Sequence, residues 1–158
     1  MKNEKFKEMH DKLATEGAEL LVKTLPDYLA GGIKPQPQDH AQATFTKKFT
    51  SDDGEIKTGD TPEQAYNKIR ALNPEPGTFF LINRGGKKLR LKIIDARLLN
   101  HLEINHLEAE PLSGGFSIKN GHLALNLKDG YIILETVQPE GKHPMTGKDF
   151  IRGYFNHQ

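Results

Sequence analysis

A short basic segment carries the residue types best suited to binding a polyanion. Between positions 84 and 97 the chain has six cationic residues and one acidic residue, Asp95. Lys88, Arg90 and Lys92 alternate there with apolar residues, so in a strand they project from one face about 6.6 Å apart. This spacing is of the order of the distance between successive phosphates, and each neutralised phosphate releases counterions. The segment predicts a phosphate-binding face. The open alternative is a solvated strand face whose charges keep the edge of the sheet from aggregating.

Other cations would extend this face if the fold brought them to it. Arg84 and Lys87 flank the alternating segment, whereas Lys47-Lys48 and Lys142 lie elsewhere in the chain. The predicted binding residues are Lys88, Arg90, Lys92, Arg84, Lys87, Lys47, Lys48 and Lys142. We expect a surface of this kind to recognise shape and phosphates and not to read bases.

The seven histidines and the absence of cysteine bear on metal binding and catalysis. His101 and His106 are five positions apart, so a helix does not align their rings and a strand puts them on opposite faces. The lack of cysteine excludes thiolate ligands and thiol nucleophiles. His143 has no evident nucleophile or carboxylate partner. We therefore predict no metal site and no catalytic residue in this chain.

Length and composition indicate one ordinary domain, or one small domain with an appendage. The chain has 158 residues, 35% of them hydrophobic, and 22 basic against 21 acidic residues give a net charge of +1. Binding of nucleic acid would therefore have to come from local clusters of cations. No apolar run approaches the roughly 20 residues that a membrane span needs, and the charged N-terminus is unlike a secretory signal. We expect a cytoplasmic protein without membrane contact.

The first part of the chain predicts a helix and an irregular connector. Apolar residues recur at helical spacing over residues 3–25, and Pro26 is expected to stop or kink the helix. Residues 34–39 read Lys-Pro-Gln-Pro-Gln-Asp and favour extended chain, with a short strand predicted at 43–49. We place residues 1–40, a terminal helix with the start of the connector, in one part and residues 41–158 in a second, β-rich domain.

The remainder predicts a small antiparallel β-barrel. Thr61-Pro62 begins a helix, and beyond Gly77 the apolar period changes to two. Turn signals at Asn120-Gly121 and Asp129-Gly130 separate short alternating strands. Thr146 is expected to cap a last helix. The predicted fold is mainly β with flanking helices, a small OB-like antiparallel β-barrel preceded by a long N-terminal helix and an extended connector.

Several short runs follow one another in the order found in the methionyl-tRNA formyltransferase family. Residues 138–145 read Gln-Pro-Glu-Gly-Lys-His-Pro-Met and resemble the Gln-Pro-x-Gly-Lys-x-x-Met run before the final helix of that family. The other runs are residues 10–14, 17–21, 34–39, 43–45, 53–56, 69–77 and 129–130. Together they span nearly the whole chain, which thus resembles the family's C-terminal portion. The resemblance implies that residues 1–40 are the terminal helix of the catalytic domain with the start of the connector, and that residues 41–158 are the family's C-terminal OB-like domain. The chain departs from the family at Glu75 and at Lys57-Thr58, where the family usually has Trp and Asp-Trp.

The resemblance implies a function that this chain carries only in part. Members of the family transfer a formyl group from 10-formyltetrahydrofolate to initiator methionyl-tRNA, and they do so in an N-terminal catalytic domain. The His-x-Ser-Leu-Leu-Pro motif of that domain is absent here. We therefore expect no transferase activity from this chain alone and no cofactor bound by it. The implied partners are initiator methionyl-tRNA, held by the basic residues above, and a catalytic formyltransferase domain.

Two other functions stay open at this point. Sugar-nucleotide formyltransferases have a similar C-terminal domain, although the Gln-Pro-Glu-Gly-Lys run at residues 138–142 favours the tRNA branch. The second alternative is a protein-interaction module without nucleic acid, in which the N-terminal helix docks onto a partner.

Overall fold

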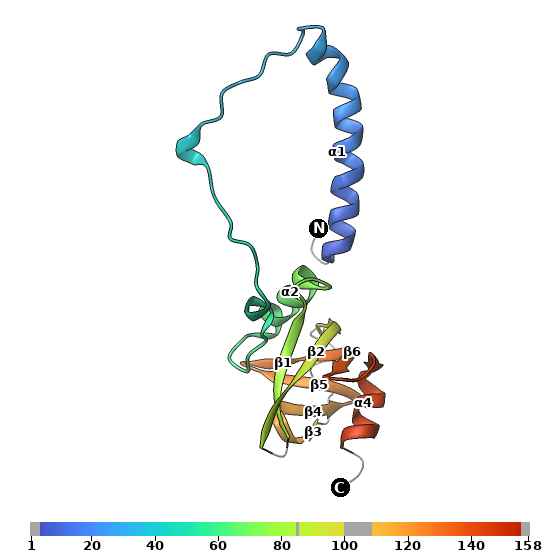
Figure 1. Cartoon of the computed structure of the whole chain (residues 1–158). Coiled ribbons are helices and arrows are strands. Elements are labelled where there is room, and N and C mark those ends of the chain that lie inside the picture. The colour runs from blue at the N-terminus through green and yellow to red at the C-terminus, as the bar shows by residue number, and fades with distance from the viewer. Residues whose placement is uncertain (1–3, 85, 100–108, 156–158) are drawn as a thin grey trace. The chain divides into compact units, whose positions relative to one another are not determined.

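The computed structural model describes residues 4–84, 86–99 and 109–155. The chain divides into two units, Met1–Lys48 and Phe49–Gln158. Figure 1 colours the first unit blue to teal and the second green to red. The first unit is helical and extended, and the second is β-rich.

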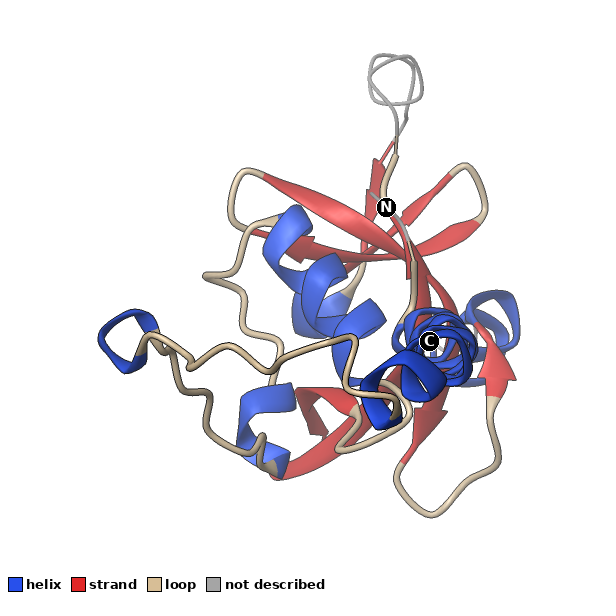
Figure 2. Cartoon of the chain, turned by 90° about the horizontal axis from the view of Figure 1, so that it is seen from above, coloured by secondary structure: helices blue, strands red, loops and turns tan. Residues whose placement is uncertain are grey.

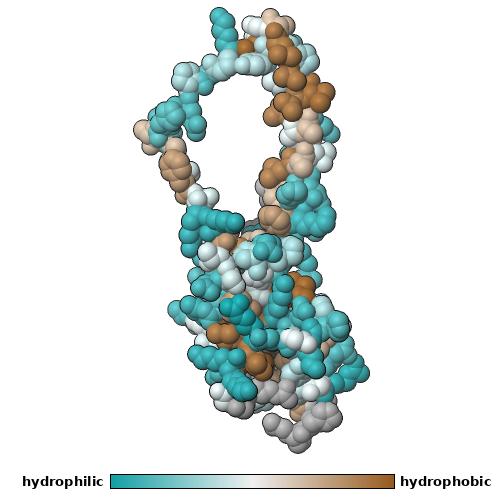
Figure 3. Space-filling view, viewed as in Figure 1, coloured by the Kyte–Doolittle hydropathy of each residue, from teal (hydrophilic) through white to brown (hydrophobic). Residues whose placement is uncertain are grey.

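The first unit contains one long helix, α1 (Phe6–Leu29), which has no buried residue. Leu13, Leu20 and Leu21 are 59%, 65% and 60% exposed, and Figure 3 shows apolar residues in brown along this helix. The predicted helix end at residue 25 is wrong, because α1 continues through Pro26. A proline removes one hydrogen-bond donor, yet the N–H of Ala30 donates to the carbonyl of Pro26 at 3.0 Å and closes the last turn.

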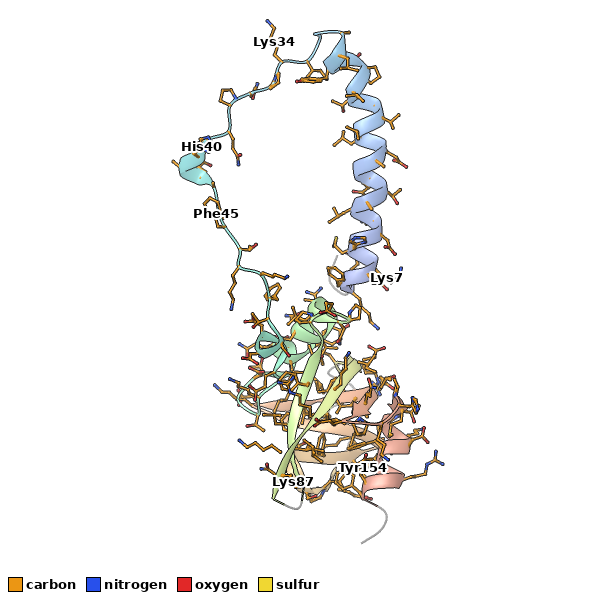
Figure 4. The ribbon with its side chains drawn as sticks, viewed as in Figure 1. Lys7, Lys34, His40, Phe45, Lys87 and Tyr154 are labelled. Carbon is orange, nitrogen blue, oxygen red and sulfur yellow. The ribbon has the colours of Figure 1, made fainter. Side chains whose placement is uncertain are left out.

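The rest of the first unit is extended chain with one 3-10 turn, η1 (His40–Gln42). Asp39 begins this turn, since its carboxylate accepts the N–H of Ala41 at 3.0 Å. The strand predicted at residues 43–49 is wrong, because the segment forms no ladder with any strand that the structure describes. Phe45 is 94% exposed, and its side chain projects from the connector in Figure 4.

The second unit is built on one antiparallel sheet of seven strands, in the order β1-β2-β6-β5-β4-β3 with β7 paired to β6. Their bounds are β1 (Thr78–Arg84), β2 (Lys87–Arg97), β3 (Ala109–Pro111), β4 (Phe116–Lys119), β5 (His122–Leu127), β6 (Gly130–Pro139) and β7 (Met145–Thr146). Figure 2 shows the strands in red crossing at changing angles as the sheet twists. The predicted class, mainly β with flanking helices, is confirmed.

The predicted closure of this sheet into a barrel is wrong for the residues that the structure describes. β1 and β3 are the two ends of the strand order and do not pair with each other. Closure needs a continuous ladder around the barrel, and β3 has only three residues. Its last residue, Pro111, has no N–H to donate to a further strand. The free side of β1 is bridged at Phe79 by Glu55 instead.

Two helices, α2 (Pro62–Leu72) and α4 (Gly147–Tyr154), cover the core of the sheet, and two 3-10 turns, η2 (Ser51–Gly54) and η3 (Ser113–Gly115), connect its elements. The Thr61 hydroxyl accepts the N–H of Gln64 at 3.2 Å, and the Gln64 side chain accepts the N–H of Thr61 at 2.9 Å, so the predicted start of α2 is confirmed. The helices bury Ala65, Ile69, Leu72, Phe150 and Ile151 against the strands.

Both predicted hairpins are present. Lys119 pairs with His122 across Asn120-Gly121, which have φ values of 48° and 73°, as the favoured two-residue hairpin turn requires. The second hairpin turns at Lys128-Asp129, one position earlier than predicted, since Leu127 pairs with Gly130. These turns place β4, β5 and β6 side by side, and β6 also pairs with β2 and with β7.

Candidate nucleic-acid interface

β2 carries three of the predicted cations on a single face. Leu91 and Ile93 are 0% exposed and belong to the core, so Lys88, Arg90 and Lys92 lie on the opposite face of the strand. Lys88 and Arg90 are exposed, and Lys92 is half-buried. The pairing with β6 becomes irregular only after Ile93. The alternation is therefore regular across all three cations.

The side chain of Arg90 is held in place by two neighbours. Its guanidinium carbon lies 4.2 Å from the centroid of the Phe79 ring, a distance at which cation–π attraction operates. Its Nη1 donates to the hydroxyl of Ser51 at 3.2 Å. Phe79 is on the same side of the sheet as the cations yet only 7% exposed. Arg90 therefore covers an aromatic ring and presents an oriented charge.

Lys92 runs beside the turn that leads into β1. A Cβ added at Gly77 would lie 3.2 Å from Cε of Lys92, so the lysine stem passes directly over this glycine. Asn73 fixes the same turn, because its amide donates to the carbonyl of Ile93 at 2.9 Å and accepts the N–H of Thr78 at 3.2 Å. The stem of Lys92 is thus confined by backbone, whereas Lys88 is exposed nearer the hairpin end.

Lys142 is exposed in the segment that joins β6 to β7. This segment leaves β6 beside β2, where the N–H of Glu140 donates to the carbonyl of Arg90 at 3.0 Å. The fold therefore brings the residue-142 turn and the cationic strand together, although fifty positions separate Arg90 from Glu140.

The remaining predicted residues lie in different places. Lys87 is exposed at the end of the β1–β2 hairpin, where Figure 4 labels it, and it pairs with Arg84 across the turn. The side chain of Arg84 lies outside the described part of the structure, as do His101 and His106. Lys47 and Lys48 are exposed residues of the first unit, whereas β2 belongs to the second.

Several contacts of this surface escaped prediction. Phe79 and Ser51 touch Arg90 only because of the β1–β2 register and the position of η2, which no spacing in the sequence reveals. Gln138 and Glu140 lie in the Gln-Pro-Glu-Gly-Lys run at residues 138–142, but the residues that they contact depend on how β2 pairs with β6. An alternation of charged and apolar residues locates the cations but not the residues that orient them.

The described residues hold neither a metal cluster nor a membrane span. Among residues 4–84, 86–99 and 109–155, no group of three His, Cys, Asp or Glu side chains is placed to hold a metal ion. None of the helices described has the length and apolar character that crossing a membrane requires.

Known proteins are similar in sequence to nearly the whole of this chain. The chain is 37% identical over 146 residues to a methionyl-tRNA formyltransferase from Streptococcus equi subsp. equi, covering 92% of this chain and 43% of that protein. It is 39% identical over 137 residues to one from Roseiflexus castenholzii, covering 87% of this chain and 41% of the relative. The chain thus spans less than half the length of these curated relatives. The likeness to the C-terminal portion of methionyl-tRNA formyltransferase is confirmed.

A solved structure shares the fold of this chain, and a family profile identifies the domain. HypX from Aquifex aeolicus matches with a TM-score of 0.61 and 14% identity, covering 88% of this chain and 23% of HypX, which is a likeness of fold. The profile described as "Formyl transferase, C-terminal domain" matches residues 48–155, most of the chain and nearly all of the second unit. With that match over the sheet, its two covering helices and the cationic strand, this chain belongs to the formyl transferase C-terminal domain family.

Proposed function

We propose that this chain is the tRNA-binding C-terminal portion of a methionyl-tRNA formyltransferase. The observation that carries the proposal is the outer face of β2, where Lys88, Arg90 and Lys92 follow one another on a strand whose other face is core. Cations at this spacing suit consecutive phosphates and bind them without reading bases. The names of the curated relatives supply the substrate class.

Initiator methionyl-tRNA is accordingly the proposed partner, and the protein is proposed to act in the cytoplasm during translation initiation. Formyl transfer from 10-formyltetrahydrofolate is assigned to a catalytic formyltransferase domain whose His-x-Ser-Leu-Leu-Pro motif does not occur in this sequence. None of the residues proposed to bind tRNA is proposed to be catalytic, and this chain alone is expected to be inactive. Turnover of initiator methionyl-tRNA by the purified chain in a formylation assay would refute that expectation.

The geometry of β2 suggests a direct binding test. Lys88→Gln and Lys92→Gln are combined, because Gln keeps most of each stem and removes the charge. The matched control combines Lys57→Gln and Lys128→Gln, which remove the same charge from two exposed positions in other turns. Binding of initiator tRNA is measured by titration over a range of salt concentrations, since a lysine that no longer neutralises a phosphate reduces the salt slope by about 1.

The β2 double variant is expected to bind several-fold more weakly, with a salt slope reduced by about 1 to 2. The control is expected to stay close to the unaltered chain. Equal weakening of both variants would mean that net charge, and not this face, sets the affinity. No binding of tRNA by the unaltered chain would favour the alternatives, a sugar-nucleotide formyltransferase domain or a protein-interaction module.

A further inference from the structure

The segment between β6 and β7 is a tight turn with a defined shape. The N–H of Lys142 donates to the carbonyl of Pro139 at 3.0 Å and closes the turn. Gly141, its third residue, has a φ of 72°, which a type II turn assigns to glycine at this position. Lys142 therefore leaves the turn in a direction fixed by backbone geometry.

Glu140 joins this turn to the cationic strand through two hydrogen bonds. Its N–H donates to the carbonyl of Arg90 at 3.0 Å, and its Oε2 accepts the N–H of Arg90 at 3.1 Å. Leu91 is paired with Pro139, which has no N–H to offer the ladder. After Pro139 the turn carries the backbone of β6 away from β2. The carboxylate of Glu140 therefore accepts the N–H of Arg90, a residue of the strand that carries the cations.

Gln138 holds the far side of the same turn. Its Nε2 donates to the carbonyl of Lys142 at 2.9 Å. Gln138 is also the β6 partner of Lys92, so both side chains lie on the outer face of the sheet. Gln138 is therefore next to Lys92 across the strands and is hydrogen-bonded to the backbone of Lys142.

We propose that residues 139–142 form a second phosphate-binding arm, with Lys142 as its cation and Glu140 and Gln138 as its positioning residues. This rests on the proposed function, because it names further residues of the same tRNA-binding surface. Glu140 is an acid in a surface assigned to a polyanion, so its charge alone weakens binding. Its benefit lies in holding Lys142 in a fixed position, which lowers the entropy cost when the lysine meets a phosphate.

The charge of Glu140 and its hydrogen bonds to Arg90 act on tRNA binding in opposite directions. Glu140→Gln removes the negative charge and keeps an oxygen that accepts the N–H of Arg90. Glu140→Ala removes the charge and the acceptor together. If only charge matters, both variants bind tRNA more tightly than the unaltered chain. If position matters, Glu140→Gln binds as well or better, and Glu140→Ala binds several-fold more weakly.

The experiment measures initiator tRNA binding and its salt slope for the full 158-residue chain and these two variants, with thermal unfolding as a check on the fold. Glu140→Ala is expected to reduce the salt slope by about 1, the value of one neutralised phosphate. In a Lys142→Ala background it is expected to cause no further weakening. Gln138→Met, which keeps the side-chain volume and removes the donor, is expected to weaken binding in the same way and serves if Glu140→Ala fails to fold.

Equal binding by Glu140→Ala and Glu140→Gln, or unchanged binding by Gln138→Met, would overturn this inference. The proposed function would survive that result if Lys88→Gln combined with Lys92→Gln still weakened binding. Absence of tRNA binding by the unaltered chain would overturn both.

Discussion

The guanidinium of Arg90 lies over the ring of Phe79, with 4.2 Å between its central carbon and the ring centroid. The two residues come from adjacent strands, and the arginine shields a ring that is only 7% exposed. A residue of the proposed RNA-binding face is therefore also part of the packing of the sheet. Binding and stability have to be measured separately at this position.

Replacing Arg90 by Lys tests this double role. The charge is kept, but the planar stack on Phe79 and the bond to Ser51 are removed. We expect the free energy of unfolding to fall by at most about 0.5–1 kcal/mol, because a lysine ammonium keeps a cation near the ring but loses the planar stack and the bond to Ser51. Urea denaturation measures this. Lys88→Arg is the control with no expected change, and an equal midpoint for Arg90→Lys and the unaltered chain would argue against the packing role.

Asn73 is expected to matter for stability although it is not itself assigned an RNA contact. Its amide joins the carbonyl of Ile93 to the N–H of Thr78, a residue that is 0% exposed. Asn73→Ala leaves this buried N–H without its partner, which costs about 1–3 kcal/mol. Thermal or urea unfolding is the measurement, and Asn67→Ala on the exposed side of α2 is the comparison. Similar small effects for both substitutions would contradict the assigned role.

Gly54 is predicted to resist substitution because of a close backbone approach. A Cβ at this position would overlap the carbonyl oxygen of Gly77, in the turn over which Lys92 passes. Gly54→Ala should lower stability by about 1–3 kcal/mol, as overpacking does. Gly59→Ala is the matched control, since an added Cβ there meets nothing within 4 Å. The free energy of unfolding of the two variants is compared by urea denaturation. Equal stability would contradict the close approach of the Gly54 and Gly77 backbones.

The start of α4 should respond to acid through Asp149. The hydroxyl of Thr146 and then the guanidinium of Arg152 hold the pKa of this carboxyl below its ordinary value of 3.8. A pKa lowered by folding adds stability above the unfolded-state pKa, and that stability is lost as the pH falls through the folded-state pKa. The advantage of the unaltered chain over Asp149→Asn should therefore shrink between about pH 5 and pH 2. A difference in urea midpoint that is constant over this range would contradict the assignment.

Local patterns were sufficient for most elements of the second unit. Alternation located β2, and Asn120-Gly121 located the β4–β5 turn, because both signals depend on neighbouring residues alone. Closure of the sheet was mispredicted because it depends on whether β1 and β3 meet, and strand patterns carry no information about that. The continuation of α1 past Pro26 was missed because a proline near a helix end removes little.

In the candidate site, too, local patterns predicted some residues, and others depended on how the strands pair. Lys88, Arg90 and Lys92 could be placed on one face from their spacing. Glu140 could not be linked to Arg90, because fifty residues separate them and only the β2–β6 register joins them. For the same reason Ser51 and Phe79 had no visible relation to the cationic strand.

The most direct test of the central claim is to map where initiator tRNA touches the chain, using the backbone amide signals of the isotope-labelled protein during titration with tRNA. The largest changes are expected at Lys88, Arg90, Lys92 and Lys142, with little change at Lys57 and Lys128. Changes that are spread evenly over these residues, or concentrated at Lys57 and Lys128, would contradict the claim.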